Sequence, residues 1–208
     1  MNFEFSDEQI AMKDEVRKLL DKENSLKRNR TILEGEEKFD KELWDSLVAM
    51  GLTAVTIPEE FGGIGMGYLE LCVIAEELGR AIAPVPYSSS VYLATTAILN
   101  CANDEIKKEF LPKLASGEII GTFAHAESSG FPLEKSINCN FSSGKISGTK
   151  AAVPDADIAD FAIVSAKNSA GVGLYLIDLN DESVEISSLD TFDPSRSHGN
   201  IDIKDASA

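Results

Sequence analysis

The sequence has few of the residues on which metal centres, disulfide frameworks and membrane spans depend. Its 208 residues include only 3 Cys, 2 His and 1 Trp, and no two cysteines stand at a Cys-x-x-Cys spacing. A metal site is therefore not expected, and the cysteines are interpreted as buried structural thiols: Cys72, Cys101 and Cys139. No run of about 18 apolar residues occurs, so the sequence predicts no membrane span.

Basic residues are scarce as well. The 19 Lys and Arg are outnumbered by 35 Asp and Glu, which gives a formal net charge of -16 at pH 7. This balance argues against a nucleic-acid partner, because phosphates are neutralised by Lys and Arg. The acidic opening of the chain lacks the basic flank and apolar run of a secretory signal. With a hydrophobic content of 43%, the sequence is typical of a soluble globular protein, and we expect a cytoplasmic location.

Apolar residues recur at helical spacing through the first half of the chain. Ser6 and Gln9 have the form of a capping box, which predicts a first helix running to about Leu20. Residues 21–39 are rich in charge and weakly periodic, so we interpret them as a connector. Four further helices are expected: from Asp40 to Gly51, over 68–78, after Pro84-Val85-Pro86, and over 104–111 before Pro112.

From Ile119 onward the pattern changes to short runs of β-branched and aromatic residues, separated by Gly, Ser, Asn and Asp. Strands are expected over 120–126, 136–141, 145–153, 161–165, 173–178 and 184–187. Ser142-Ser143-Gly144 predicts a hairpin turn between the second and third strands. We therefore predict an α+β fold, with a helical domain over residues 1–118 and an antiparallel, sandwich-like or barrel-like β domain over 119–208.

The glycine-rich stretch over 62–67 lies between a strand-like segment, 54–57, and the predicted third helix. A dinucleotide fingerprint is one interpretation, but its register places Tyr68 where the third glycine belongs. No Val/Ile-rich strand with a terminal acid follows, so a structural glycine loop is favoured. The residues taken by themselves contain no GxSxG motif or other convincing catalytic constellation.

Several stretches together resemble the flavin-dependent acyl-CoA dehydrogenases. Pro58 to Gly65 is followed by a helix ending Glu76-Glu77-Leu78-Gly79-Arg80, and residues 111–118 read Leu-Pro-Lys-Leu-Ala-Ser-Gly-Glu. The family's opening resembles Phe5 to Gln9, and its second helix resembles Trp44 to Leu52. The motif before its flavin-contacting strand resembles Gly148-Thr149-Lys150, and the strand that closes its β domain resembles Asp190 to Arg196. The resemblance ends where the family's C-terminal four-helix bundle begins, so we expect that bundle to be missing from this sequence.

The resemblance implies FAD as cofactor and an acyl-CoA thioester as substrate, with α-proton and β-hydride removal and electron transfer to an electron-transfer flavoprotein or similar acceptor. By position, two segments would contact the flavin: His125, Ala126, Glu127 and Ser128, and Ala152, Val153 and Pro154. Four residues after Pro84-Val85-Pro86 are expected to face the acyl pocket, with ordinary helix core as an equal alternative: Tyr87, Ser90, Val91 and Ala94. The family's catalytic Glu belongs to the missing bundle, so no catalytic residue is nominated.

Two interpretations of function remain open. The family's flavin-bonding hydroxyls are absent at Ala126 and Pro154, and its aromatic wall is absent at Ala152. One interpretation is the front two-thirds of an acyl-CoA dehydrogenase. The other is a non-catalytic partner subunit of a heteromeric one, and residues 83–86 resemble the divergent branch that acts on steroid side chains. Both predict a homo- or hetero-oligomer.

Overall fold

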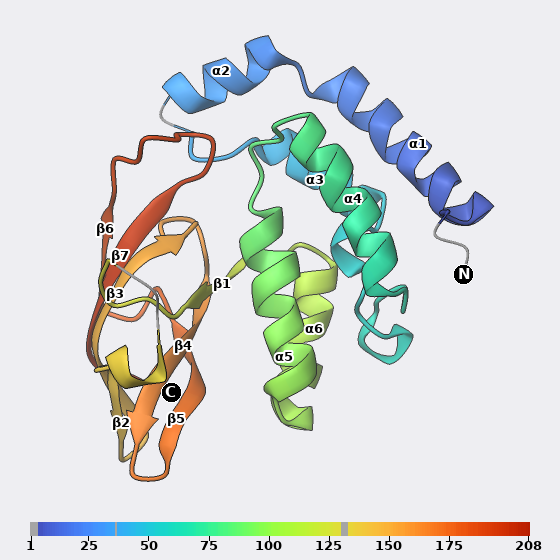
Figure 1. Ribbon diagram of the computed structural model, residues 1–208. Coiled ribbons are helices and arrows are strands. Elements are labelled where there is room, and N and C mark those ends of the chain that lie inside the picture. The colour runs from blue at the N-terminus through green and yellow to red at the C-terminus, as the bar shows by residue number, and fades with distance from the viewer. Residues whose placement is uncertain (1–3, 36, 130–132) are drawn as a thin grey trace. The chain divides into compact units, whose positions relative to one another are not determined.

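The computed structural model describes residues 4–35, 37–129 and 133–208, and it confirms the predicted α+β fold (Figure 1). Contacts within the chain define two compact units. Unit 1 comprises residues 1–85 and 108–117, and unit 2 comprises residues 86–107 and 118–208. The two predicted halves differ from these units in one respect, because residues 86–107 lie with the strands.

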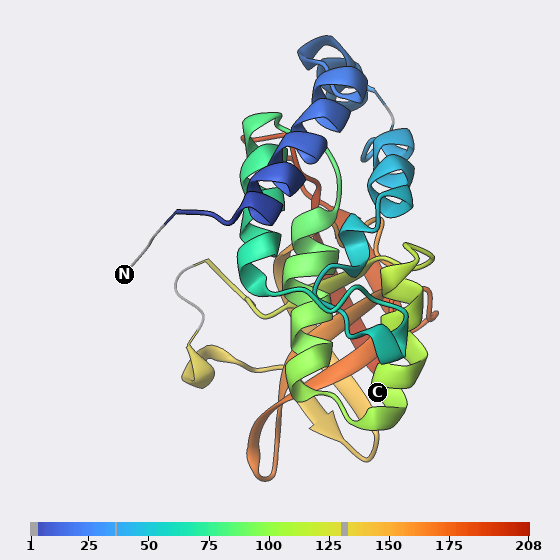
Figure 2. The same cartoon turned by 90° about the vertical axis from the view of Figure 1, so that its right-hand side faces the viewer.

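Unit 1 is built from helices and short 3-10 turns. Its elements are α1 (Asp7–Glu23), α2 (Leu26–Glu34), α3 (Lys41–Ala49), η1 (Leu52–Ala54), η2 (Glu59–Phe61), α4 (Tyr68–Arg80) and the second part of α6 (Asp104–Ala115). The predicted capping box is present, since the Ser6 hydroxyl accepts a hydrogen bond from the Gln9 amide and the Gln9 side chain accepts one from the Ser6 amide. Helix α1 packs on α4, and it buries Val16 and Leu20 (Figure 2).

Three expectations about local structure in this region are corrected. The supposed connector 21–39 contains helix α2, which buries only Asn29 and Ile32 and so carries almost no apolar period. Residues 54–57 are not a strand, because 3-10 turn η1 ends at Ala54 and a turn follows. Helix α6 passes through Pro112 to Ala115, because the buried Leu111 and Leu114 hold the turns on both sides of the proline and outweigh one lost backbone hydrogen bond.

The glycine loop has a structural cause. A Cβ on Gly63 would lie 1.9 Å from the carbonyl oxygen of Ile57, so only glycine fits where the two backbones meet. The loop is closed by backbone hydrogen bonds from Gly63 to Pro58 (3.1 Å) and from Gly65 to Ile57 (2.8 Å). With no strand before it, the loop does not have the strand–turn–helix context of a dinucleotide site, which agrees with the favoured interpretation.

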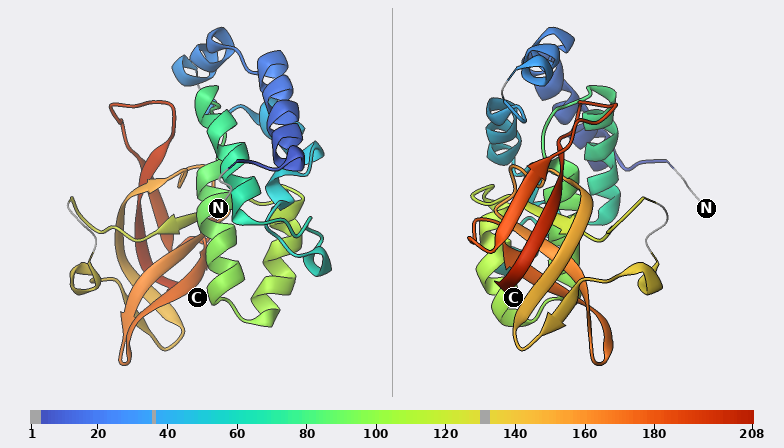
Figure 3. Two further views of the ribbon diagram at one scale, coloured as in Figure 1. Left: turned by 45° about the vertical axis from the view of Figure 1, so that its right-hand side comes forward. Right: turned by 90° about the vertical axis from the view of Figure 1, so that its left-hand side faces the viewer.

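Unit 2 contains a curled mixed sheet (Figure 3). Its strands are β1 (Gly121–Ala124), β2 (Asn140–Ser142), β3 (Lys145–Pro154), β4 (Phe161–Asn168), β5 (Gly171–Asp178), β6 (Val184–Ser188) and β7 (His198–Ser207), with a 3-10 turn, η4 (Glu134–Ser136), before β2. Along the sheet the order is β1-β4-β2-β3-β7-β6, and β5 also pairs with β4. The predicted hairpin at 142–144 is confirmed.

Two features of the sheet differ from the sequence expectation. The β1–β4 and β2–β4 pairs are parallel, so the domain is not antiparallel throughout. The segment Asp190 to Arg196 is a loop, and the closing strand is β7, which pairs with both β3 and β6. Strand β7 alternates buried Ile201 and Ile203 with polar neighbours, and its Asn and Asp are poor strand formers that conceal it in the sequence.

Unit 2 also contains two helical segments before the sheet. Residues Ser88–Thr95 form a π-helix, η3, which continues as α5 (Thr96–Cys101). Helix η3 packs against β1. A Cβ on Gly121 would lie 2.7 Å from the Cβ of Ala94 and 2.5 Å from the ring of Phe161, so the glycine permits this close packing. A π-helix of this length is unusual, and π-helical turns are frequently found at functional sites.

The cysteines are not all buried. Cys139 has 1% of its surface exposed, whereas Cys72 and Cys101 are exposed. Cys72 lies between the buried Leu71 and Val73, on the outer side of helix α4. Within the ranges that the structure covers, no three His, Cys, Asp or Glu side chains are placed to share a metal ion, and no helix is both long and apolar enough to cross a bilayer.

Candidate functional site

The sheet brings the two predicted flavin-contacting segments together. They lie at the ends of β1 and β3, which are not neighbours in the strand order. The Ala151 amide donates a hydrogen bond to the Ala126 carbonyl at 2.8 Å. The Thr122 hydroxyl donates to the Pro154 carbonyl at 2.6 Å. Curling of the sheet therefore places residues about 25 positions apart in direct contact.

A β-bulge interrupts β3 at this contact. Lys150 pairs with Ile201 and Val153 pairs with Gly199, so Ala151 and Ala152 both lie opposite Asn200. Ala152 is exposed and has a left-handed φ of 49°, which is costly for a residue with a Cβ. Its amide donates to the Asn200 side-chain oxygen at 3.1 Å. The bulge thus turns Ala152 outward, while the next residue, Val153, is buried.

A buried ion pair links the first segment to the strand residue just before the bulge. The Lys150 side chain is fully buried, and its ammonium contacts the Glu127 carboxylate at 2.7 Å. The same ammonium donates to the Ser165 hydroxyl at 3.1 Å and to the His125 carbonyl at 3.2 Å. Ser165 also lies 2.9 Å from the His125 ring nitrogen Nδ1. One lysine on β3 thereby connects the end of β1 with the central strand β4.

Glu127 receives two further hydrogen bonds, from backbone amides before β2. The Asn138 amide donates to one carboxylate oxygen at 2.5 Å, and the Cys139 amide donates to the other at 3.0 Å. Burial of Glu127 acts to raise its pKa, but the donors, Lys150 foremost, outweigh burial and lower that pKa below its ordinary value. Glu127 is therefore an ionised carboxylate whose oxygens are already occupied. Burial raises the pKa of the neighbouring Cys139 thiol to about 11.

The predicted substrate-facing residues are buried along η3. Tyr87, Ser90, Val91 and Ala94 each have 2% or less of their surface exposed. The Ser90 hydroxyl accepts from the Gly121 amide at 3.3 Å, and the Tyr87 ring meets Tyr92 edge-on at 5.1 Å. Burial, together with Tyr92, raises the pKa of Tyr87 well above its ordinary value. Contact of these four residues with a substrate stays a prediction. Contact of the segments His125–Ser128 and Ala152–Pro154 with flavin also stays a prediction.

A second buried polar cluster, which sequence reasoning missed, joins η3 to the bulge. Asp155 follows Pro154 with a left-handed φ of 54° and is 2% exposed. Its carboxylate pairs with Arg196 and accepts from the Ser89 hydroxyl at 2.5 Å. Arg196 also donates to the Ser88 hydroxyl. The cluster fixes the first turn of η3 to the chain after β3 and to the loop before β7.

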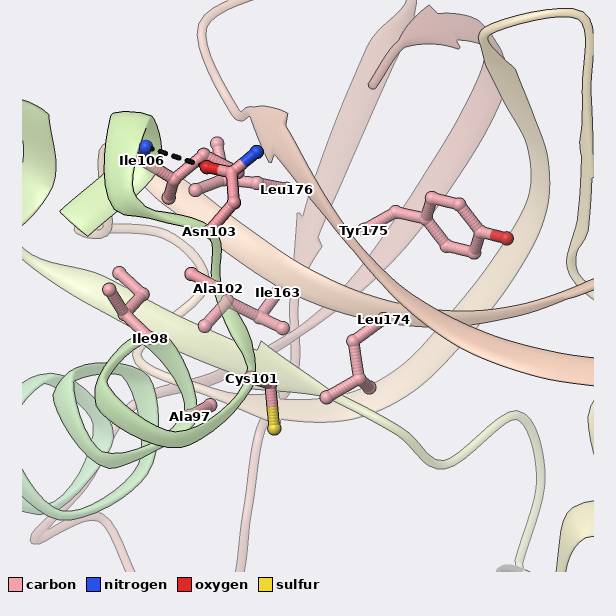
Figure 4. A pocket seen from close by; sticks show the side chains of 10 residues that line it. All are labelled: Ala97, Ile98, Cys101, Ala102, Asn103, Ile106, Ile163, Leu174, Tyr175 and Leu176. Atoms are coloured by element: carbon pink, nitrogen blue, oxygen red, sulfur yellow. Dashed lines mark hydrogen bonds between the residues drawn. The ribbon is translucent and has the colours of Figure 1, made fainter.

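Unit 2 also holds an apolar cavity of about 270 Å³ between α5, the start of α6 and strands β4 and β5 (Figure 4). Its walls include Ile98, Cys101, Ile163, Leu174 and Leu176. The Tyr175 side chain points away from the cavity, as the alternation along β5 requires. Sequence reasoning did not identify this cavity, although the alternating Leu174 and Leu176 were a visible signal of an apolar strand face.

Comparison with known proteins agrees with this architecture. Residues 6–118 match the family described as "Acyl-CoA dehydrogenase, N-terminal domain". Acyl-CoA dehydrogenase FadE27 of Mycobacterium tuberculosis (strain ATCC 25618 / H37Rv) is 31% identical over 157 residues, which are 75% of this chain and 42% of that protein. The chain therefore spans less than half the length of this relative.

Two solved structures share the fold over nearly all of the chain. A chain of the ChsE4-ChsE5 complex from Mycobacterium tuberculosis has a TM-score of 0.90 and 26% identity, and the match covers 100% of this chain and 57% of that one. A variant of the Tcur3481-Tcur3483 steroid ACAD has a TM-score of 0.85 and 29% identity, over 96% and 55% of the two chains. The fold is thus that of the front part of an acyl-CoA dehydrogenase. The chain belongs to the acyl-CoA dehydrogenase family.

Proposed function

We propose that this chain supplies the flavin-facing part of an acyl-CoA dehydrogenase, which removes hydrogen from the α and β carbons of an acyl-CoA thioester. The observation that carries the proposal is the hydrogen bond from Ala151 to Ala126 beside the bulge. It joins the first of the two segments that the family places against the flavin to the residue directly before the second, and the bulge turns Ala152 outward there. Bound FAD would supply the hydride acceptor.

The chain's own residues would shape and orient this site. Ala152, near the end of β3, and Ser128, after β1, are exposed and would contact the flavin. No other described residue forms a hydrogen bond with Ser128, so its hydroxyl and amide fit a flavin edge. Glu127 does not suit the role of general base, because its carboxylate already accepts three hydrogen bonds and its pKa is lowered.

A second candidate function is a partner subunit that holds no flavin itself. The observation that favours it is that the backbone polar groups of the site already form hydrogen bonds within the chain or, at Pro154, are absent. The Ala152 amide bonds Asn200, the Ala126 carbonyl bonds the Ala151 amide, and Pro154 has no amide hydrogen. The similarity to a chain of the ChsE4-ChsE5 complex agrees with a heteromeric assembly. In that case a second chain would bind the flavin.

Flavin retention by the purified chain separates the two functions. The chain is incubated with excess FAD, freed of unbound ligand, and examined by visible absorption. Retained flavin bands support the first function, and a colourless protein that becomes coloured only in complex with a second chain supports the other. A protein that retains no flavin with or without a partner chain would contradict both.

Restoring the family's hydroxyls gives the matched test. Ala126→Thr combined with Pro154→Thr returns two groups that bond the flavin in the family, so we expect FAD affinity to rise roughly fivefold for each hydroxyl that bonds it. Ala170→Thr adds the same group in the exposed turn between β4 and β5 and should change nothing. Unchanged affinity in the double variant would show that these segments do not border FAD.

The proposed partners follow from charge and family. Coenzyme A is an anion, and this chain also carries a negative net charge, of -16, so the two repel each other unless basic groups lie between them. We therefore propose that basic groups from another domain or subunit bind its phosphates, in a homo- or hetero-oligomer. An electron-transfer flavoprotein or similar acceptor would reoxidise the flavin. Restoration of turnover on mixing this chain with candidate partner chains is the measurement that checks this assembly.

A further inference from the structure

Lys150 is the least expected buried residue in unit 2. Its side chain has no exposed surface, and burial of an ammonium ion is costly unless it is paired and hydrogen-bonded. Its three acceptors are a carboxylate, a hydroxyl and a backbone carbonyl, which matches the three hydrogens of the ammonium. The pocket around this nitrogen is therefore complete for a charged lysine.

The positions of those acceptors matter more than their number. His125 and Glu127 belong to the segment after β1, while Lys150 is the last paired residue of β3 before the bulge. Glu127 in turn accepts from the amides of Asn138 and Cys139, just before β2. The ion pair thus links the segment after β1, the bulge in β3 and the start of β2 through one pair of charges.

Stability alone is a weak reason for such a pair. A buried ion pair often stabilises a protein no more than well-packed apolar residues of the same volume would, because both charges must be desolvated. What apolar residues cannot do is fix direction. A charge-assisted hydrogen bond constrains both distance and angle, so this pair defines how the two segments face each other.

We propose that Lys150 and Glu127 are positioning residues, which hold the His125–Ser128 segment and the bulge at Ala151 and Ala152 in the mutual placement that the cofactor requires. The inference rests on the proposed flavin-facing function. It assigns the two residues no contact with FAD: Lys150 acts through the His125 carbonyl and Glu127, and Glu127 acts through the amides that it accepts.

The test uses a pair of variants on the purified chain. Lys150→Met removes one charge and leaves Glu127 buried without its partner, so it lowers stability as well as positioning. Lys150→Met combined with Glu127→Gln removes both charges at nearly constant volume, which allows stability to recover. Lys145→Met makes the same change at an exposed position on the same strand and serves as the control.

Two readouts separate positioning from stability. The first is amide hydrogen exchange, measured at Asn138, Cys139 and Ala151, whose amides donate to the Glu127 carboxylate and the Ala126 carbonyl, relative to the slowest-exchanging amides of the sheet. The second is the dissociation constant for FAD. For the double variant we expect midpoint denaturant concentrations near those of the wild type, local exchange at least tenfold faster, and FAD affinity at least tenfold weaker. The control should match the wild type in the denaturant midpoint, in local exchange and in FAD affinity.

The outcomes are distinguishable from failure of the proposed function. If the wild-type chain binds no FAD, the proposed function is wrong for this chain alone, yet the exchange measurement still tests the positioning role. If the double variant keeps wild-type exchange at these residues, the inference is overturned. Should Lys150→Met not fold, Ser165→Ala removes one acceptor of Lys150 and should produce the same local increase in exchange to a smaller extent.

Discussion

The clearest quantitative consequence of the structure concerns Glu77, in helix α4. Its side chain is fully buried, and its carboxylate accepts from Arg17 on α1 at 2.6 and 2.9 Å and from Arg80 at 2.7 Å. The Arg17 hydrogen bond is the largest influence on the Glu77 pKa; burial opposes it, and Arg80 supports it. Together they lower that pKa from 4.5 to about 2. Glu77 is therefore a buried electrostatic link between α1 and α4.

The magnitude of the link follows from the change in pKa. From 4.5 to about 2, at roughly 1.4 kcal/mol per pH unit, the stabilisation is about 3 kcal/mol at neutral pH. The two arginine side chains are 44% and 41% exposed, so solvent screens part of this attraction. We expect Glu77→Gln to lower the free energy of unfolding by about 2 kcal/mol at pH 7.

The pH dependence gives the sharper test. Because the folded-state pKa of Glu77 is depressed, its contribution is fully present above the unfolded pKa of 4.5 and is lost as the pH falls toward about 2. Urea unfolding of wild type and Glu77→Gln between pH 7 and pH 3 should show a constant difference down to about pH 5 and a shrinking one below. Glu76→Gln, an exposed partner of Lys13, should cost less than about 1 kcal/mol. A Glu77→Gln difference that stays constant across this range would refute the electrostatic argument.

Two smaller predictions concern the bulge in β3 and the three cysteines. Ala152→Gly should raise the free energy of unfolding by about 1 kcal/mol in urea titrations, because glycine adopts the left-handed φ of the bulge without steric cost; equal or lower stability would argue against strain there. In the folded chain, a thiol reagent at pH 8 should modify Cys72 and Cys101 quickly and Cys139 slowly, since Cys139 is buried and its pKa is about 11. Equal rates at the three thiols, measured by mass spectrometry, would contradict this.

Local sequence signals predicted much of the fold. The capping box at Ser6 and Gln9, the apolar stripe of α1 and the hairpin at 142–144 all depend on residues close together in the chain, and the structure contains each of them. Helix α2 and strand β7 escaped prediction for the opposite reason. Both are polar segments, and distant partners hold them: Asn29 donates to the carbonyls of Ala81 and Ile82, and β7 pairs with two other strands.

The candidate site divides in the same way. Resemblance to a family assigned flavin contact to the segments at His125–Ser128 and Ala152–Pro154, and that contact stays a prediction, while the structure shows that the first segment bonds the residue before the second. It did not identify the residues that hold them together. Lys150 reads as an ordinary strand lysine, and Asp155 and Arg196 are 41 positions apart, so neither cluster is visible until the sheet curls.

The sequence by itself therefore determined the change from a helical to a β pattern, since periodicity and capping residues act over a few positions, and its motifs carried the resemblance to the family. Only the tertiary structure decided where β1 meets β3, that residues 86–107 lie with the sheet, and which charges are buried. The physical reason is that burial and the pairing of charges depend on surfaces contributed by distant segments. Burial of a lysine ammonium destabilises the fold where it has no partner and fixes neighbouring segments where it is paired and hydrogen-bonded. Its partners come together only after the chain has folded.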